Sequence, residues 1–164
     1  MMPDTLDPAV ERQLAVDLFN HVWRLIEIEQ RTVAEDDSMV HAAHASRWHW
    51  GRVGGPEQWA IGEWQCSRVY ALLGRGEQSL HHARRCLEIC EEHGIESFVP
   101  ASAHEALARA YARLAAHVRD LGDEGLRRSA LNKPRLRRRL LHAWQAHAKA
   151  QGLSLAQTTA HLQG

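Results

Sequence analysis

The sequence predicts an all-α protein built as a stack of antiparallel helical hairpins, with a basic helical cap at its C-terminal end. Apolar residues recur at three- and four-residue spacing through most of the chain, as expected for helices with one buried face. No window alternates polar and apolar residues with period two, so a β-sheet is not expected. An internal repeat with a period of 41 residues indicates that the helices form similar units.

Capping signals place the first two helices. Asp7 followed by Pro8 predicts a helix over residues 8–31, because proline tolerates the first helical position and the Asp side chain can accept hydrogen bonds from free amides. The segment EDDS (35–38) is expected to cap a second helix that runs to Trp50.

Glycine and proline separate the later helices. The sequence GRVGGP ends the second helix, and Pro56 opens a third that ends at LGRG. A fourth helix is expected from Glu77 to His93, where Gly94 stops it, and a fifth over about residues 100–117.

Two helices of the chain reappear later at a constant offset. A shift of 41 residues lays SMVHAAHASRW (38–48) over SLHHARRCLEI (79–89), and it lays Tyr70 over Tyr111. Repeats of this length are typical of stacked helical hairpins, in which no single hairpin can bury its apolar face alone.

The segment WQCSRVYALLGRGEQSLHHARRCLEI resembles a tetratricopeptide repeat. An aromatic residue opens its first helix, Ser67 precedes Tyr70, Gly74 stands at the turn, and the small residues Ser79 and Cys86 lie on the second helix. Small residues are needed there because the two helices of a hairpin cross closely.

The resemblance covers about residues 36–117 and extends to a first helix at 8–31. It departs from the family in its period, which exceeds the usual length of about 34 residues, and in lacking the closing proline after Ile89. The resemblance implies a non-enzymatic scaffold that binds a peptide or partner protein in a groove lined by the first helix of each hairpin. Carried over residue by residue, the groove positions are Trp64, Arg68, Leu72, Glu105, Arg109 and Arg113. The arginines among them suit an acidic partner, since guanidinium binds carboxylate through paired donors.

Charge is distributed unevenly along the chain. All 20 acidic residues lie at or before Glu124, together with 12 of the 20 Lys and Arg, so the formal charge is −8 for residues 1–124 and +8 for residues 125–164. We therefore expect a hairpin domain over 1–124 and a basic helical extension over 125–164, packed on the same domain. Such asymmetry also raises nucleic-acid binding as a third, less favoured function. Its candidate residues are Arg135, Arg137, Arg138 and Arg139.

The stretch HAAHASRWHW raises an enzymatic alternative. His41 and His44 share a helix face and could hold a metal ion with a ligand from another helix, such as His82, as in a metal-dependent helical bundle. The alanines between them favour hairpin packing instead, and His41 aligns with His82 in the repeat, as a structural position would. We therefore predict no catalytic residue, no bound metal and no cofactor.

Four of the tryptophans cluster between the second and third helices. Aromatic residues at such places are more often buried than exposed as a stacking platform. Core or hairpin-junction positions are therefore expected for Trp48, Trp50, Trp59 and Trp64.

Cysteine usage points to a reducing compartment. The three cysteines, Cys66, Cys86 and Cys90, are an odd number without paired-motif spacing, and the start MMPDTLDPAV has no basic segment followed by an apolar one. No apolar run approaches the roughly 20 residues needed to cross a bilayer. A cytoplasmic protein that does not span a membrane is predicted, and a homo-oligomer is left open.

Overall fold

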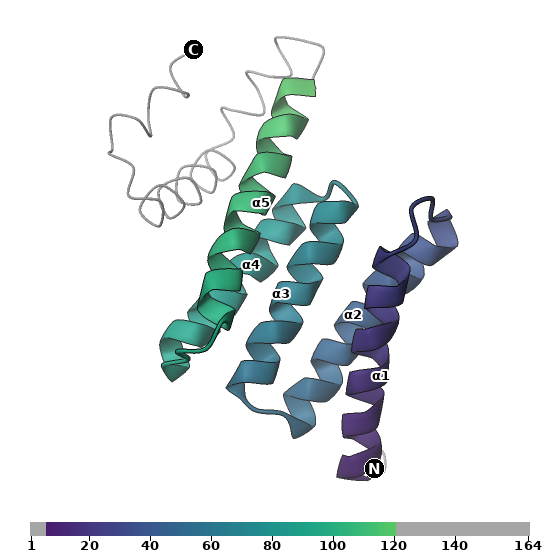
Figure 1. The fold of residues 1–164 in the computed structure, drawn as a ribbon, viewed down its shortest axis with the longest axis vertical. Coiled ribbons are helices and arrows are strands. Elements are labelled where there is room, and N and C mark those ends of the chain that lie inside the picture. Colours follow the sequence, from purple (N-terminus) through teal and green to yellow (C-terminus); the bar gives the residue numbers. More distant parts are fainter. Residues whose placement is uncertain (1–5, 121–164) are drawn as a thin grey trace, which may run out of the picture.

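The computed structural model describes residues 6–120, and these residues form five α-helices and no β-strand. The predicted all-α fold is confirmed for this part of the chain. The helices follow one another through short turns and alternate in direction (Figure 1). None of these five is long and apolar enough to span a membrane. Their bounds are α1 Pro8–Ile26, α2 Val33–Val53, α3 Pro56–Leu72, α4 Gly76–His93 and α5 Val99–Asp120.

Side-chain hydrogen bonds mark both ends of α1. At its start, Asp7 accepts a hydrogen bond from the backbone amide of Ala9 at 2.8 Å, which confirms the predicted cap. At its end, the prediction of a helix reaching residue 31 is wrong, because α1 ends at Ile26. Arg31 lies outside the helix and folds back, donating from Nη1 to the carbonyl oxygen of Ile28 at 2.9 Å. Its guanidinium therefore interacts with backbone that follows the helix end.

The second helix, α2, begins earlier than predicted. Its N-cap is Thr32 and not the segment 35–38: the Thr32 hydroxyl accepts from the Glu35 amide at 3.3 Å, and the Glu35 carboxylate accepts from the Thr32 amide at 2.7 Å. This reciprocal capping box satisfies two amides that would otherwise be free, so it outweighs the later acidic residues as a start signal. The helix also continues beyond Trp50, to Val53.

The three later helices match the predicted segments closely. Their first residues agree with the expected ones to within one position, and glycines stand at the turns after α3 and α4. Gly74 and Gly94 have positive φ angles of 70° and 59°, a conformation that glycine adopts without steric cost. Each of these turns therefore reverses the chain at a position where a larger residue would be strained.

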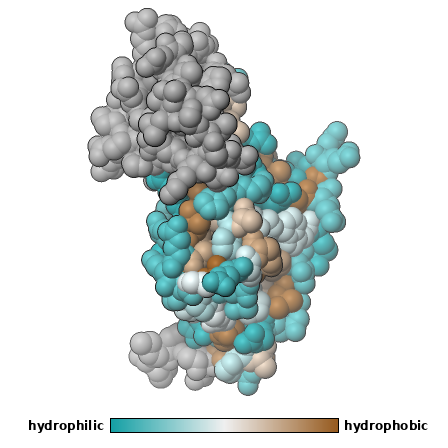
Figure 2. Space-filling model, turned by 60° about the vertical axis from the view of Figure 1, so that its left-hand side comes forward, coloured by the Kyte–Doolittle hydropathy of each residue, from teal (hydrophilic) through white to brown (hydrophobic). Residues whose placement is uncertain are grey.

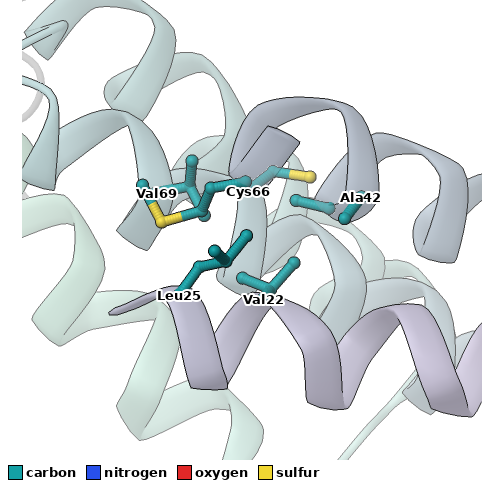
Figure 3. Close-up of a cluster of buried hydrophobic side chains, with 7 residues drawn as sticks. Val22, Leu25, Ala42, Cys66 and Val69 are labelled. Carbon is teal, nitrogen blue, oxygen red and sulfur yellow. The ribbon is translucent and has the colours of Figure 1, made fainter. Parts of the chain in front are cut away.

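Helix α3 is the centre of the packing. Each helix contacts its neighbours in sequence, and α3 also contacts α5. Figure 3 shows how Val22 and Leu25 of α1 face Ala42 of α2 and Cys66 and Val69 of α3, all of them buried. Two further apolar clusters join α4 to α5 and α3 to both. The core thus runs from α1 to α5 through α3.

The small residues singled out in the segment 64–89 lie where α3 and α4 pack together. Ser67, Ser79 and Cys86 are all fully buried. Their burial agrees with the expectation that small side chains are needed where these two helices approach each other.

The tryptophans near the α2–α3 turn differ in their burial. Trp59 donates from Nε1 to the carbonyl oxygen of Trp50 at 2.9 Å, so these two residues join the helices at the turn. Trp48 is 66% exposed, so the prediction of a core or junction position for it is wrong. It lies on the solvent side of α2, where the period of the helix, and not the residue type, decides burial.

Hydrophilic side chains cover much of the face in Figure 2, with apolar side chains in patches between them.

Candidate functional site

Aromatic rings and a guanidinium from α1 and α3 gather on one face of the molecule. The rings of Trp23 in α1 and Trp64 in α3 are tilted against each other, with centroids 5.7 Å apart. Phe19, one turn before Trp23, meets its ring edge-on at 6.2 Å. The guanidinium carbon of Arg68 lies 5.5 Å from the centroid of the Trp23 ring, in a cation–π contact. Helical spacing brings these groups together, since each pair within a helix is four residues apart.

A second guanidinium comes from α5, which packs against α3. Arg109 forms an ion pair with Glu105 of its own helix. Burial lowers the pKa of Arg109, and the positive charge of Arg68 lowers it further. Two arginines from neighbouring helices therefore lie within electrostatic reach of each other. We call this set (Phe19, Trp23, Trp64, Arg68 and Arg109) the aromatic–arginine face.

Several polar atoms at and beside this face are buried without a hydrogen-bond partner. Within the described residues they include Nε1 of Trp64, Nε of Arg68, Nη1 of Arg109 and Nδ1 of His104, which all come from α3 and α5. A buried donor left unpaired costs about 1–3 kcal/mol. The first three are N–H donors closed to solvent, so a ligand acceptor would reach them only where the side chains turn outward to meet it. Carboxylate oxygens are suitable acceptors, since they bind guanidinium through charge-assisted hydrogen bonds.

The face contains most of the groove residues that the sequence predicted. Trp64, Arg68 and Arg109 belong to it, and Glu105 joins it through Arg109. Leu72 and Arg113 are exposed on α3 and α5.

Sequence analysis missed the contribution of α1 to this face. Phe19 and Trp23 stand four residues apart, as do residues on one side of a helix. They lie beside the buried apolar stripe that contains Val22 and Leu25, and the apolar pattern of α1 does not separate the two. The four-residue spacing of these two aromatic residues was the signal that could have identified them.

The histidines raised as metal ligands form a separate cluster of α2, α3 and α4. His44 and His82 have ring centroids 5.2 Å apart, and His41, which is exposed as His44 is, lies one turn earlier in α2. His44 Nε2 hydrogen-bonds the Tyr70 hydroxyl at 2.9 Å, and His82 Nδ1 hydrogen-bonds Glu63 Oε2 at 2.7 Å. Between residues 6 and 120, no group of three or more His, Cys, Asp or Glu could hold a metal ion.

The environment of this cluster shifts two of its ionisable groups. Burial lowers the pKa of His44, and the charge of His82 adds to the effect. Burial raises the pKa of Glu63, but the hydrogen bond and charge of His82 and the charge of Arg47 outweigh it, so that the pKa is lowered overall. Glu63 is thus held as a carboxylate between Arg47 Nε at 2.9 Å and the imidazole of His82.

The cysteines do not provide a reactive thiol. All three are buried. Burial raises the pKa of Cys66 and of Cys86 to about 12, and the negative charge of Glu63 contributes to both. A nucleophilic cysteine needs a lowered pKa and access to solvent, so neither residue has the properties of one.

The predicted nucleic-acid residues and the basic extension lie outside the described residues. They include Arg135 and Arg137 to Arg139.

Comparison of the chain with family models, with curated proteins and with solved structures gives no match.

Proposed function

We propose that this chain is a tetratricopeptide-like scaffold that binds an acidic peptide or protein segment on the aromatic–arginine face. The observation that carries the proposal is the meeting of two guanidinium groups, Arg68 and Arg109, beside the Trp23 ring that Arg68 contacts. A ligand carboxylate that meets these partly exposed guanidinium groups would gain charge-assisted hydrogen bonds.

Burial along the internal repeat supports the tetratricopeptide-like part of the proposal. Met39 and Leu80, which the 41-residue shift superimposes, are 0% and 1% exposed. Ala42 and Ala83, the next superimposed pair on the packing face, are 5% and 0% exposed. Matching burial at these two pairs is expected when each hairpin packs in a similar way on its neighbour.

The side chains on the face favour a carboxylate over other acceptors. Burial lowers the pKa of Arg109 and the charge of Arg68 lowers it further, so a carboxylate between the two guanidinium groups would relieve their repulsion. The ring of Trp23, already beneath the Arg68 guanidinium, offers an apolar surface beside the charge. An acidic segment with a neighbouring apolar residue fits this combination best.

Selection from a library of random peptides tests the proposal. The probes would be peptides displayed with free C-termini, selected against the full chain and against an Arg68→Ala, Arg109→Ala double variant. We expect peptides enriched in Asp, Glu or a terminal carboxylate. We also expect at least a tenfold loss of affinity in the double variant, measured by calorimetry.

An Arg85→Ala variant provides the matched control. Arg85 lies on the surface of α4, where it pairs with Glu88 and Glu92, so its loss should leave peptide affinity unchanged. Circular dichroism would establish that each variant is folded. Selection of peptides without acidic groups, or equal binding by the double variant, would overturn the proposal.

A further inference from the structure

The histidine cluster of α2 and α4 is not used by the proposed function. The rings of His44 and His82 meet at 64° with centroids 5.2 Å apart. Two more histidines are close: the ring of His81 lies 5.0 Å from that of His82, and His41 is exposed one turn before His44. Imidazole is the commonest protein ligand for transition metals, so this grouping is chemically significant.

One ring nitrogen of His44 and one of His82 are each hydrogen-bonded to another side chain. Glu63, which is 8% exposed, accepts the hydrogen bond of His82 Nδ1 at 2.7 Å, and Tyr70 Oη lies 2.9 Å from His44 Nε2. Arg47 holds the other carboxylate oxygen of Glu63 at 2.9 Å. Metal-binding histidines are commonly oriented in this way, by a carboxylate or another polar group on the nitrogen that does not bind the metal. Nε2 of His82 and Nδ1 of His44 are then the nitrogens for coordination.

The separation of the two rings suits one shared ion. With metal–nitrogen distances of about 2.0–2.1 Å and a tetrahedral angle, two imidazoles on one zinc ion have centroids roughly 5 Å apart. The observed separation of 5.2 Å is therefore compatible with one shared ion and no movement of the helices. Tyr70 also stacks on His82, with centroids 5.5 Å apart and ring planes 7° from parallel, which limits where that ring can lie.

We propose that His44 and His82 form a binding site for a divalent transition-metal ion, with Glu63 and Tyr70 as positioning residues. Since no three ligating side chains converge among residues 6–120, water molecules complete the coordination. Ligands of this type select zinc, nickel or copper over magnesium or calcium, which prefer oxygen. The proposal stands independently of the aromatic–arginine face.

Metal titration of the untagged full chain tests the proposal. Zn²⁺ and Ni²⁺ would be titrated calorimetrically into wild type, His44→Ala and His82→Ala, with His21→Ala of α1 as the control for a chain rich in histidine. We expect one site of highest affinity that is weakened at least tenfold in either cluster variant and is unchanged in His21→Ala. Equal binding by wild type and both cluster variants would overturn the proposal, as would equal losses in all three variants.

Spectroscopy and a positioning variant make the test specific. Electron paramagnetic resonance of the Cu²⁺-loaded protein should show coupling to two imidazole nitrogens, and coupling to one or none would contradict a shared site.

Glu63→Gln should weaken metal binding by about 10- to 100-fold, since a carboxylate that hydrogen-bonds a metal-binding histidine contributes that much. Where Glu63→Gln does not fold, Tyr70→Phe keeps the stacked ring and removes only the hydroxyl. Unchanged affinity in the folded positioning variant would overturn the role assigned to that residue.

Discussion

The hydroxyl of Ser79 donates a hydrogen bond to the backbone carbonyl oxygen of Ser67 at 2.9 Å, and the two hydroxyl oxygens are 3.2 Å apart. Both side chains are fully buried where α4 packs on α3. A side-chain donor thus reaches the backbone of the facing helix, which is possible only because both residues are small. This contact links the pattern of small residues in the sequence to the closeness of the two helices.

Enlarging Ser79 should therefore separate α3 from α4. We expect Ser79→Val to destabilise the fold by about 1–3 kcal/mol, since added methyl groups in a packed crossing force neighbours apart and the hydrogen bond is lost. Urea denaturation followed by circular dichroism measures the change. Ser79→Ala, which removes only the hydrogen bond, should cost less, and equal costs for the two variants would contradict the steric explanation.

Two helical glycines should respond oppositely to alanine. A Cβ at Gly76 would lie 2.8 Å from Leu114 Cγ and 3.1 Å from the Leu114 backbone nitrogen, so Gly76→Ala should push α5 from α4 and destabilise the protein. At Gly51, which is exposed, the nearest atom is an Arg47 guanidinium nitrogen at 3.2 Å, which can move. Gly51→Ala should stabilise by up to about 1 kcal/mol through helix propensity. Melting temperatures that shift in the same direction would refute this contrast.

Buried Glu11 should contribute more stability than a surface acid. It is 3% exposed and pairs with Arg52 and with His49 Nδ1, the latter at 3.3 Å. Because Arg52 is itself 40% exposed, we expect Glu11→Gln to cost about 1–3 kcal/mol, below the loss typical of a fully buried pair. Glu92→Gln, which breaks an exposed pair with Arg85, should change stability by less than about 0.5 kcal/mol. Chemical denaturation of both variants decides the comparison.

The buried thiols predict a loss of stability at alkaline pH. In the unfolded chain the thiols of Cys66 and Cys86 ionise near their ordinary pKa of 9.0, whereas in the fold burial raises the pKa of each to about 12. The unfolded state therefore binds fewer protons above pH 9, and stability falls as pH rises from about 9 to 12. Thermal melts in a reducing buffer across this range should show a shallower decline for Cys86→Ala than for wild type.

Helix positions could be predicted from the sequence where local signals act alone. Asp7 with Pro8 and the glycine after His93 mark helix ends through their own backbone chemistry, so the helix ends that they predict are confirmed. The start of α2 was misread because Thr32 acts together with Glu35, and the acidic run after it gave a competing signal.

Tertiary relationships were only partly accessible from the sequence. A repeat pattern predicts Trp64, Arg68 and Arg109 as groove positions, whereas the contacts of Trp64 and Arg68 with Trp23 depend on how α1 lies against α3. The pairing of His82 with Glu63 joins two helices as well, and no spacing along the chain indicates it. Trp48 shows the opposite error, since residue type suggested burial and its place on α2 exposes it.

Because Trp23 and Trp64 are in contact on the aromatic–arginine face, their intrinsic fluorescence can be used to detect ligand binding there. Indole emission responds to charge and solvent around the ring, and both rings lie at the place where an acidic ligand would meet Arg68. Trp48, which is 66% exposed, supplies a steady background because it lies elsewhere, on the solvent side of α2. Intrinsic fluorescence of the unlabelled protein, compared with that of Trp23→Phe, therefore reports directly on occupancy of this face.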